Sequence, residues 1–240
     1  VVSGDAAISN PNANSTLINQ TSPNAIINWQ SFSVGSDEFV TFNQPSSSAA
    51  VLNRVIGGSP SEIFGHLLAN GRVFLINPQG IMFAPGAQID VGGLVASTLD
   101  IANNDFNNGR YIFAGNSAAS IRNEGSISAG QFGFVVFAGD SISNAGIIQT
   151  EQGEVLLASG SGLRLDLDGR GIINYEITQA ALSDTAGVSN TGSVLADGGA
   201  VVLAANVASQ LAQTVVNNAG RIQARSLVRG EKGEIILSAQ

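Results

Sequence analysis

Two short blocks of apolar and polar positions recur through the second half of the chain. The first block reads apolar, x, Asn, x, Gly, x, apolar, x, then Ala or Thr, and the second reads Gly, x, three apolar residues and a small residue. The first occurs as IRNEGSISA (121–129), ISNAGIIQT (142–150), VSNTGSVLA (188–196) and VNNAGRIQA (216–224), and the second as GFVVFA, GEVLLA, GAVVLA and GEIILS, starting at 133, 153, 199 and 233. Units of about 20 residues that bury their apolar faces only against neighbouring units predict a solenoid.

The short β blocks favour a parallel β-helix among the solenoids. Leucine-rich repeats need a Leu pattern that is missing, and helical repeats need longer units rich in helix formers. Asn and Gly tolerate positive φ, which suits the corners between strands, and stacked Asn side chains form ladders between coils. We therefore interpret eight repeat residues as structural corners: Asn123, Gly125, Asn144, Gly146, Asn190, Gly192, Asn218 and Gly220.

Two insertions interrupt the predicted coils. The step from Asn144 to Asn190 is 46 residues (144 to 190), and within it residues 163–178 alternate apolar and polar around an Asp-Gly pair. This pattern predicts an extra-helical β-hairpin with one polar face, on which Asp166 and Asp168 lie together. The segment NNDFNNG (103–109) predicts a loop, followed by a strand at 111–113, so the second insertion lies near 103–113.

The first quarter of the chain lacks the repeat. Residues 1–50 hold short irregular apolar blocks and are predicted to form the N-terminal cap that a solenoid needs over its first coil. Residues 51–240 are then the β-helix coils of the same structural domain. Ser59, Pro60 and Glu62 match a helix start, which predicts a short helix from Pro60 to about Leu68 with His66 in a structural position.

Composition and charge exclude several classes of function. With 10 Lys plus Arg against 18 Asp plus Glu, the net charge is −8, and the scattered cations argue against a nucleic-acid surface. Cysteine is absent, which excludes disulfides and thiolate chemistry, and no apolar run reaches the length of a membrane span. The chain opens on Val1 without a start Met, and the strand block ending near Gln240 would leave an open coil edge, so we expect a fragment of a longer protein.

Four motifs in the first hundred residues resemble a known family. AIINWQSF (25–32) is followed by LNRVIGG (52–58), GRVFLINPQGI (71–81) and GGLVAST (92–98). In this order and spacing they resemble the secretion domain of filamentous-haemagglutinin-type exoproteins, the TpsA partners of two-partner secretion in Gram-negative bacteria. The resemblance implies a right-handed β-helix with a cap and extra-helical strands, which serves as the secretion signal of a large exported adhesin-like protein.

The resemblance also implies a partner and a motif. The partner is the outer-membrane TpsB transporter, which recognises the domain through its periplasmic POTRA domains. The family's Asn-Pro-Asn-Gly motif falls on Asn77, Pro78, Gln79 and Gly80, with Gln79 in place of Asn. Asn53 stands where some members carry a second motif, which is not present here in its literal form. We predict that these five residues act in transporter recognition or in folding.

Two other classes of function are weighed against this one. A β-helix polysaccharide lyase needs clustered carboxylates, a base or bound calcium, and the candidates Asp166, Asp168, Glu151 and Glu154 are interpreted as solvated. His66 has no ligand partners in the sequence, so we expect no enzyme, no cofactor and no metal site. A carbohydrate- or protein-binding adhesin module is the second alternative, although Trp29 fits cap packing better than a ligand platform.

The sequence also suggests how export proceeds. Between Arg72 and Val95 the only charged residues are Arg72 and Asp90, which suits recognition of an extended chain by strand addition before folding. The first coils then nucleate folding at the cell surface, because each new coil adds to an existing edge. We expect a monomer without stable membrane insertion that is secreted or held at the cell surface after transit through the periplasm.

Overall fold

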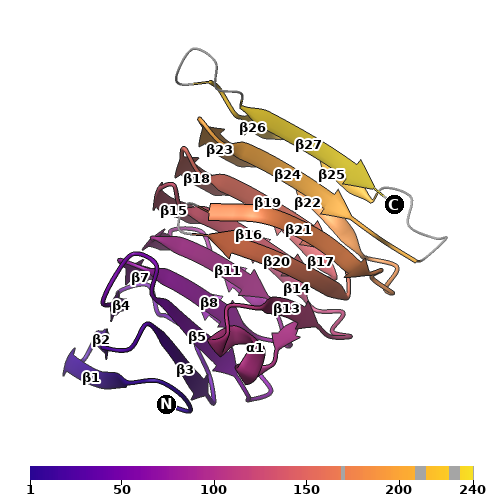
Figure 1. Cartoon of the computed structure of the whole chain (residues 1–240). Coiled ribbons are helices and arrows are strands. Elements are labelled where there is room, and N and C mark those ends of the chain that lie inside the picture. Colours follow the sequence, from indigo (N-terminus) through magenta and orange to yellow (C-terminus); the bar gives the residue numbers. More distant parts are fainter. Residues whose placement is uncertain (169–170, 209–214, 227–232, 240) are drawn as a thin grey trace.

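A computed structural model of the protein describes residues 1–168, 171–208, 215–226 and 233–239. Within these ranges there are one helix and 27 strands, and the strands form four sheets. Three sheets are the faces of a right-handed parallel β-helix, and the fourth lies outside it (Figure 1). The coils are stacked from the N-terminus to the C-terminus, so the predicted all-β solenoid with extra-helical strands is confirmed.

The nine-stranded sheet forms the first face of the solenoid. Its neighbours pair in parallel, except that β1 pairs with β2 antiparallel at the N-terminal edge. In spatial order its strands are β1 (Ala6–Asn12), β2 (Ser15–Gln20), β4 (Phe39–Asn43), β7 (His66–Ala69), β10 (Gln88–Val91), β15 (Ser126–Gln131), β18 (Ile147–Glu151), β23 (Ser193–Asp197) and β26 (Arg221–Gln223).

The other two faces are fully parallel. The eight-stranded sheet contains β3 (Asn24–Trp29), β5 (Ala50–Val55), β8 (Arg72–Ile76), β11 (Gly93–Ser97), β16 (Phe134–Gly139), β19 (Glu154–Ser159), β24 (Ala200–Ala205) and β27 (Glu234–Ala239). The six-stranded sheet contains β6 (Ser61–Ile63), β9 (Ile81–Phe83), β14 (Ser120–Asn123), β17 (Ser141–Asn144), β22 (Gly187–Asn190) and β25 (Val216–Asn218).

The fourth sheet, called here the outer sheet, is antiparallel and packs on the eight-stranded sheet. Its strands are β12 (Asp100–Ile101), β13 (Tyr111–Ala114), β20 (Gly162–Asp168) and β21 (Gly171–Gln179). The predicted hairpin is formed by β20 and β21, in which Leu165 pairs with Tyr175. β13 pairs with β20, so the two insertions of the repeat meet in one sheet.

Strand register explains the repeat. The first block supplies one strand to the six-stranded sheet and one to the nine-stranded sheet, and the second block supplies a strand to the eight-stranded sheet. Ile121 pairs with Ile142, Ile142 with Val188, and Val188 with Val216, so equivalent positions of successive blocks stack directly. Each apolar column therefore continues from coil to coil.

The eight-stranded sheet is buried on both faces, which gives the molecule two apolar layers. Leu157 of β19 points into the solenoid interior, whereas its neighbour Leu156 packs in the layer under the outer sheet. A strand covered on both sides needs a continuous apolar run rather than alternation. This explains why the second block contains three consecutive apolar residues.

The helix predicted from Pro60 to Leu68 is wrong. These residues instead form β6 and β7 on two different faces of one coil, and β6 pairs with β9 while β7 pairs with β4 and β10. Gly65 between them lies so close to the preceding coil that a Cβ would meet the Gly35 carbonyl oxygen at 2.1 Å. Hydrogen bonds to neighbouring coils outweigh the local capping signal, since tertiary context routinely overrides helix propensity.

The loop predicted at 103–109 is also wrong in part, because it contains helix α1 (Asn103–Asn107). Phe106 is fully buried and meets Phe74 edge-on, with 5.2 Å between ring centroids. One turn of helix thus places an aromatic ring under the outer sheet. The strand expected next is present as β13.

Parallel pairing already begins inside the segment predicted as the cap. β2 pairs with β4 and β3 with β5, so both strands belong to the stacked faces. β1 lies antiparallel across the exposed side of β2, where it covers an edge strand that would otherwise be open to other chains. The division of the chain at residue 50 stays a prediction.

Candidate functional site

The predicted motif Asn77–Gly80 forms a tight turn between β8 and β9. The Gly80 N–H donates to the Asn77 carbonyl oxygen at 3.0 Å, and the Gln79 N–H donates to Asn77 Oδ1 at 2.9 Å. Gly80 has a φ of 112°, which glycine adopts without strain. Gln79 does not need a positive φ, so its replacement of the family's Asn leaves the turn intact.

The Asn77 side chain is fully buried and spans adjoining coils. Its Nδ2 donates to the Ser59 carbonyl oxygen and to Ser61 Oγ, both at 3.0 Å. Its own N–H donates to the Ser97 carbonyl oxygen of the next coil at 2.9 Å. The amide therefore fixes the turn against the coil before it, while its backbone fixes it to the coil after it.

Only the tip of the turn faces solvent, where Pro78 and Gln79 are exposed. Ser117 Oγ donates to the Pro78 carbonyl oxygen at 2.5 Å. Nothing in the sequence pattern indicated that Ser61 and Ser117 are partners of this turn. The strand pairing of β6 with β9, which brings Ser61 to the turn, was hidden by the incorrect helix prediction for 60–68.

Asn53 lies inside the solenoid rather than at a corner. Its Oδ1 accepts a hydrogen bond from Trp29 Nε1 at 3.0 Å, and its Nδ2 donates to the Phe74 carbonyl oxygen at 3.4 Å. Trp29 meets Phe32 edge-on at 5.5 Å, which agrees with the interpretation of this indole as internal packing. Asn53 and the motif turn occupy neighbouring coils but have different partners, so the structure gives them separate hydrogen-bond networks.

The four corner asparagines form one ladder. Asn123 Nδ2 donates to Asn144 Oδ1 at 2.8 Å, Asn144 Nδ2 to Asn190 Oδ1 at 2.7 Å, and Asn190 Nδ2 to Asn218 Oδ1 at 2.7 Å. The first three side chains are fully buried, whereas Asn218 is exposed. Asn144 and Asn190 each accept from the coil before and donate to the coil after, so the same bond repeats along the stack.

The corner glycines are required for a reason other than the one we expected. Positive φ occurs at neither the four asparagines nor Gly125, Gly146, Gly192 and Gly220. A Cβ at Gly146 would instead meet the Gly125 carbonyl oxygen at 2.1 Å, and one at Gly192 would meet the Gly146 oxygen at 2.1 Å. Close approach of stacked backbones, not left-handed geometry, excludes larger residues here.

Of the four candidate carboxylates, Glu154 and Asp168 are close enough for their charges to interact, whereas Glu151 lies on the nine-stranded sheet. Asp166 pairs with Arg164 at 3.6 Å on the exposed face of the hairpin, as predicted for a solvated edge. Glu151 is exposed, but Glu154 is half-buried, which corrects its prediction as solvent-facing. Burial raises the Glu154 pKa, the hydrogen bond from the Ile172 N–H lowers it, and the charge of Asp168 raises it further.

His66 stacks flat on Phe39 with 4.3 Å between ring centroids, on the outer side of the nine-stranded sheet. Across the described ranges, no group of three or more His, Cys, Asp and Glu side chains could hold a metal ion. None of the helical segments among those residues is long and apolar enough to cross a membrane.

Comparison with known proteins gives the same family from sequence and from structure. The family model described as TPS secretion domain matches residues 2–240. Two heme/hemopexin-binding proteins of Haemophilus influenzae are 36% and 34% identical over 100% and 99% of this chain. The matches cover 26% and 27% of those proteins, so the chain spans about a quarter of the curated relatives.

Two solved structures share the fold. The HMW1 secretion domain of Haemophilus influenzae superposes with a TM-score of 0.84 at 32% identity, over 98% of this chain and 60% of that one. The filamentous hemagglutinin secretion domain superposes with a TM-score of 0.53 at 15% identity, over 99% and 98%, and supports the fold alone. The chain therefore belongs to the TPS secretion domain family, the secretion-signal domains of large exported TpsA proteins.

Proposed function

We propose that an outer-membrane TpsB transporter recognises this domain through its POTRA domains while the chain is still unfolded. The observation that carries the proposal is the state of the two motif asparagines. Asn53 and Asn77 have 0% exposed surface and are held by hydrogen bonds inside the folded solenoid. A partner that reads these amides must therefore meet them before the coils close.

The domain then nucleates β-helix folding outside the cell. Each coil presents a parallel strand edge, and the asparagine ladder continues from coil to coil as far as Asn218 in the described residues. Bonds made at that edge favour forward addition, because a chain segment that has paired loses its freedom to slide back. This role requires transit of the extended chain through the periplasm before release at, or attachment to, the surface.

The proposed signal acts as a monomer without catalysis, a cofactor, nucleic acid or stable membrane insertion. The separate positions of Glu151, Asp166 and His66 support a non-catalytic role, since acid–base chemistry needs paired groups within hydrogen-bond reach of one another. The net charge of −8 supports the exclusion of nucleic acid. TpsA exoproteins as a family are secreted or surface-exposed.

Secretion of the domain tests the role directly. The domain carrying a signal peptide should reach the medium in cells that contain the cognate TpsB transporter and stay in the periplasm in cells without it. A transporter that lacks its POTRA domains is the matched control and should release none. Equal release with and without the transporter would reject the proposal.

Substitution of Asn77 separates recognition from folding. Asn77→Ala should lower secretion more than its loss of stability explains, whereas Asn144→Ala, which removes another buried amide, should lower secretion only in proportion to slower refolding. Secretion yield and refolding rate of the purified variants are the two measurements. If both variants lose secretion yield in the same proportion to their loss of refolding rate, relative to the parent, Asn77 acts through folding alone and the recognition role is wrong.

A further inference from the structure

A polar depression of about 490 Å³ lies on the nine-stranded sheet, where β15, β18, β23 and β26 run side by side. Its described lining contains neither Lys nor Arg. Hydroxyl, amide and carboxylate groups line it, from Ser128, Gln131, Gln149, Glu151, Asp197 and Gln223.

Strand register arranges this lining in rows that cross the coils. Ser128 pairs with Gln149, Gln149 with Leu195, and Leu195 with Gln223. Neighbouring strands of a sheet are about 4.8 Å apart, so side chains in a row recur at an interval close to the length of one pyranose unit. The rows therefore offer repeated contacts to a chain of sugar units that lies along the stack.

Some of the polar side chains hold one another in place. Gln223 Nε2 donates to the two carboxylate oxygens of Asp197 at 2.8 and 3.0 Å. Asp197 also pairs with Arg225 Nε at 3.5 Å, and the hydrogen bond from the Arg225 N–H lowers the Asp197 pKa, so this carboxylate stays ionised as an acceptor. Within the described part of the chain, no hydrogen bond or ion pair occupies the side chains of Gln149 and Glu151.

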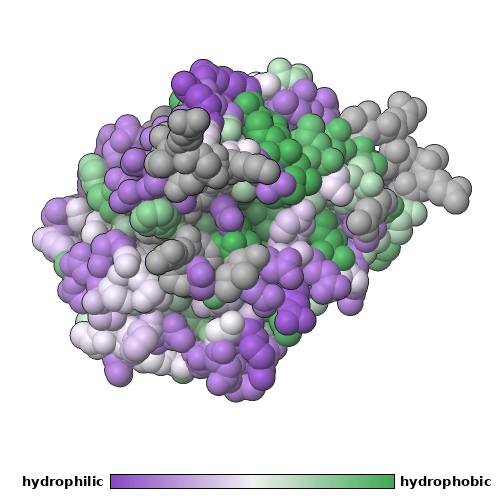
Figure 2. Space-filling model, turned by 45° about the horizontal axis from the view of Figure 1, so that its top comes forward, coloured by the Kyte–Doolittle hydropathy of each residue, from purple (hydrophilic) through white to green (hydrophobic). Residues whose placement is uncertain are grey.

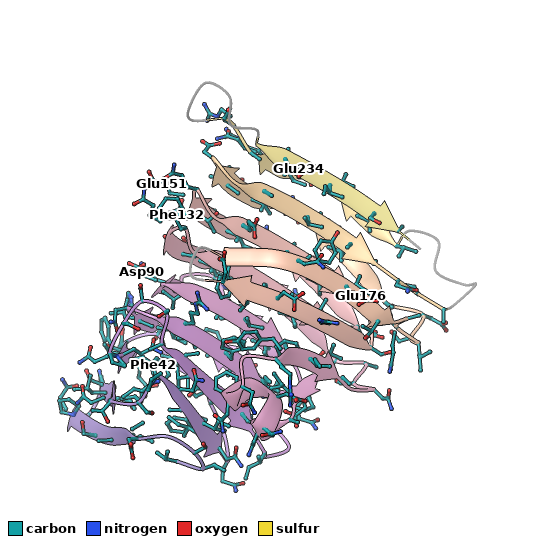
Figure 3. The ribbon with its side chains drawn as sticks, in the orientation of Figure 1. Phe42, Asp90, Phe132, Glu151, Glu176 and Glu234 are labelled. Carbon is teal, nitrogen blue, oxygen red and sulfur yellow. The ribbon has the colours of Figure 1, made fainter. Side chains whose placement is uncertain are left out.

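An exposed aromatic ring stands at the edge of the depression. Phe132 follows Gln131 in the chain, is 45% exposed, and donates its N–H to the Glu151 carbonyl oxygen at 2.8 Å. Figure 3 shows Phe132 and Glu151 next to each other at one edge of the stack.

The backbone at this edge is irregular in a way that serves the ring. The pairing of β15 with β18 shifts register between Ala129 and Gln131, and Phe132 has a φ of 58°, which is strained for a phenylalanine. Bulges re-aim side chains, and strained residues that packing does not require are concentrated at ligand sites. The position of Phe132 is therefore explained better by contact with a ligand than by packing.

The groups present match a sugar. Sugar hydroxyls both donate and accept hydrogen bonds, which amides do in return, while carboxylates accept them. An exposed aromatic ring packs against the C–H face of a pyranose. Glu151 and Asp197, with no Lys or Arg in the described lining, disfavour an anionic ligand.

We propose that this depression binds a neutral oligosaccharide that lies along the stack from β15 to β26, with one sugar ring on Phe132 and the hydroxyls of the next units bonded to the amide and carboxylate side chains. The site belongs to the folded domain. It goes beyond recognition of the unfolded chain by the transporter and does not depend on it.

Titration calorimetry with defined hexasaccharides tests binding to the purified domain. At least one of cellohexaose and maltohexaose, which are neutral and differ in shape, should bind saturably. Hexagalacturonate, of equal length and anionic, should bind at least about tenfold more weakly, because it meets two carboxylates. Amide NMR shifts caused by the bound sugar should be confined to β15, β18, β23 and β26 and the turns that join their ends.

Variants separate contact with the sugar from folding. Phe132→Gly removes the ring and the strain, so it should weaken binding at least about tenfold without loss of stability, whereas Phe132→Trp keeps an aromatic surface and should keep binding. Gln149→Ala should weaken binding with an unchanged Tm, since no partner within the described chain is lost. The control is Phe39→Ala, because Phe39 is 40% exposed on the same sheet and β7 and β10 separate its strand from β15.

Four results would overturn the proposal. The first is that neither neutral hexasaccharide binds, and the second is that hexagalacturonate binds as tightly as they do. The third is unchanged affinity in Gln149→Ala and in Phe132→Gly, and the fourth is NMR shifts elsewhere on the molecule. If Phe132→Gly fails to fold by circular dichroism, the affinity of Gln149→Ala decides.

Discussion

The two halves of the solenoid hold their buried amides in different ways. From Asn123 to Asn190, each corner asparagine donates to the asparagine of the next coil. In the first half the buried asparagines have partners of other kinds, since Asn53 holds the Trp29 indole and Asn77 holds Ser61, and only one buried amide, Gln44, bonds to an identical residue, Gln20. The second half repeats one interaction along its corner, while the first half combines several.

This difference separates two tasks of the same fold. A repeated corner accepts any further coil that carries the motif, so it favours growth of a long stack. Unique partners permit only one register, because a slipped strand would leave a buried donor without an acceptor, at a cost of about 1–3 kcal/mol. The first coils thus define where the stack begins, and the later coils extend it.

The largest expected effect comes from the glycine column of the repeated half. A Cβ at Gly146 would lie 2.1 Å from the Gly125 carbonyl oxygen, so Gly146→Ala should force the coils apart and lower the free energy of unfolding by about 3 kcal/mol. Gly58→Ala is the control in the first half, because a Cβ there meets nothing within 4 Å. Equal chemical denaturation midpoints for the two variants would contradict the close-approach explanation.

The ladder should behave as one unit. Asn144→Ala should cost about 2 kcal/mol, because it breaks the bonds to Asn123 and Asn190. Asn190→Ala added to it should cost less than the sum of the two single variants by about 1 kcal/mol, whereas Asn53→Ala should add fully to Asn144→Ala. Urea unfolding of the six proteins, namely the parent, the three single variants and the two double variants, measures both cycles. Additive losses within the ladder would remove the distinction between the halves.

A smaller gain is expected at an irregular corner of the repeated half. Phe132, Gln152 and Gly198 have φ values of 58°, 52° and 81°, and each residue's N–H donates to the following coil. Phe132 is 45% exposed, so packing does not compensate for its left-handed backbone (Figure 3). Phe132→Gly should raise the free energy of unfolding by about 0.5–1 kcal/mol, measured by thermal unfolding. A loss of stability would show that the exposed ring contributes packing.

The smallest effect concerns pH. Because burial raises the Glu154 pKa above 4.5, the folded state holds this proton more tightly than the unfolded chain. Its contribution to stability is complete below the unfolded pKa and is lost as the pH rises through the folded pKa. Glu154→Gln stays uncharged, so its Tm should rise relative to the parent between about pH 4 and pH 7. Glu151→Gln controls for lost charge, and a pH-independent difference would contradict the argument.

The repeated half could be predicted from sequence, because residues that stack on one another in successive coils recur at matching positions of the repeat. The columns of Ile121, Ile142 and Val188, and the hairpin of β20 and β21, follow from alternation and period. The glycine column was located correctly but explained wrongly. A carbonyl oxygen from the coil below is not visible in a local pattern, although the recurrence of Gly at one position was the signal.

The first half could be predicted only through resemblance. Ser59, Pro60 and Glu62 fit a helix start, yet the segment forms strand β6 because it pairs with β9. The hydrogen-bond partners of Asn53 and Asn77 are distant in sequence, and the pairing register of the strands brings them together. No spacing in the sequence therefore predicts them. Resemblance to the family motifs identified these two residues as functional candidates, and the structure shows that they are buried.

The outer sheet changes how the stack comes apart. A simple solenoid frays coil by coil from its ends, as in a one-dimensional chain of neighbours. Here β13 pairs with β20, which lies about fifty residues later in the sequence. Arg54 of β5 donates to the Asp100 carboxylate, and Arg72 of β8 donates to the Asp168 carbonyl oxygen. Both arginines therefore connect the solenoid to the outer sheet. The middle of the stack must then open as one cooperative unit, while the apolar C-terminal end, with Ile235 46% exposed, opens alone (Figure 2). In the proposed export route, these ties are complete once residues up to Gln179 have emerged, and backward movement past that point would require this unit to unfold as a whole.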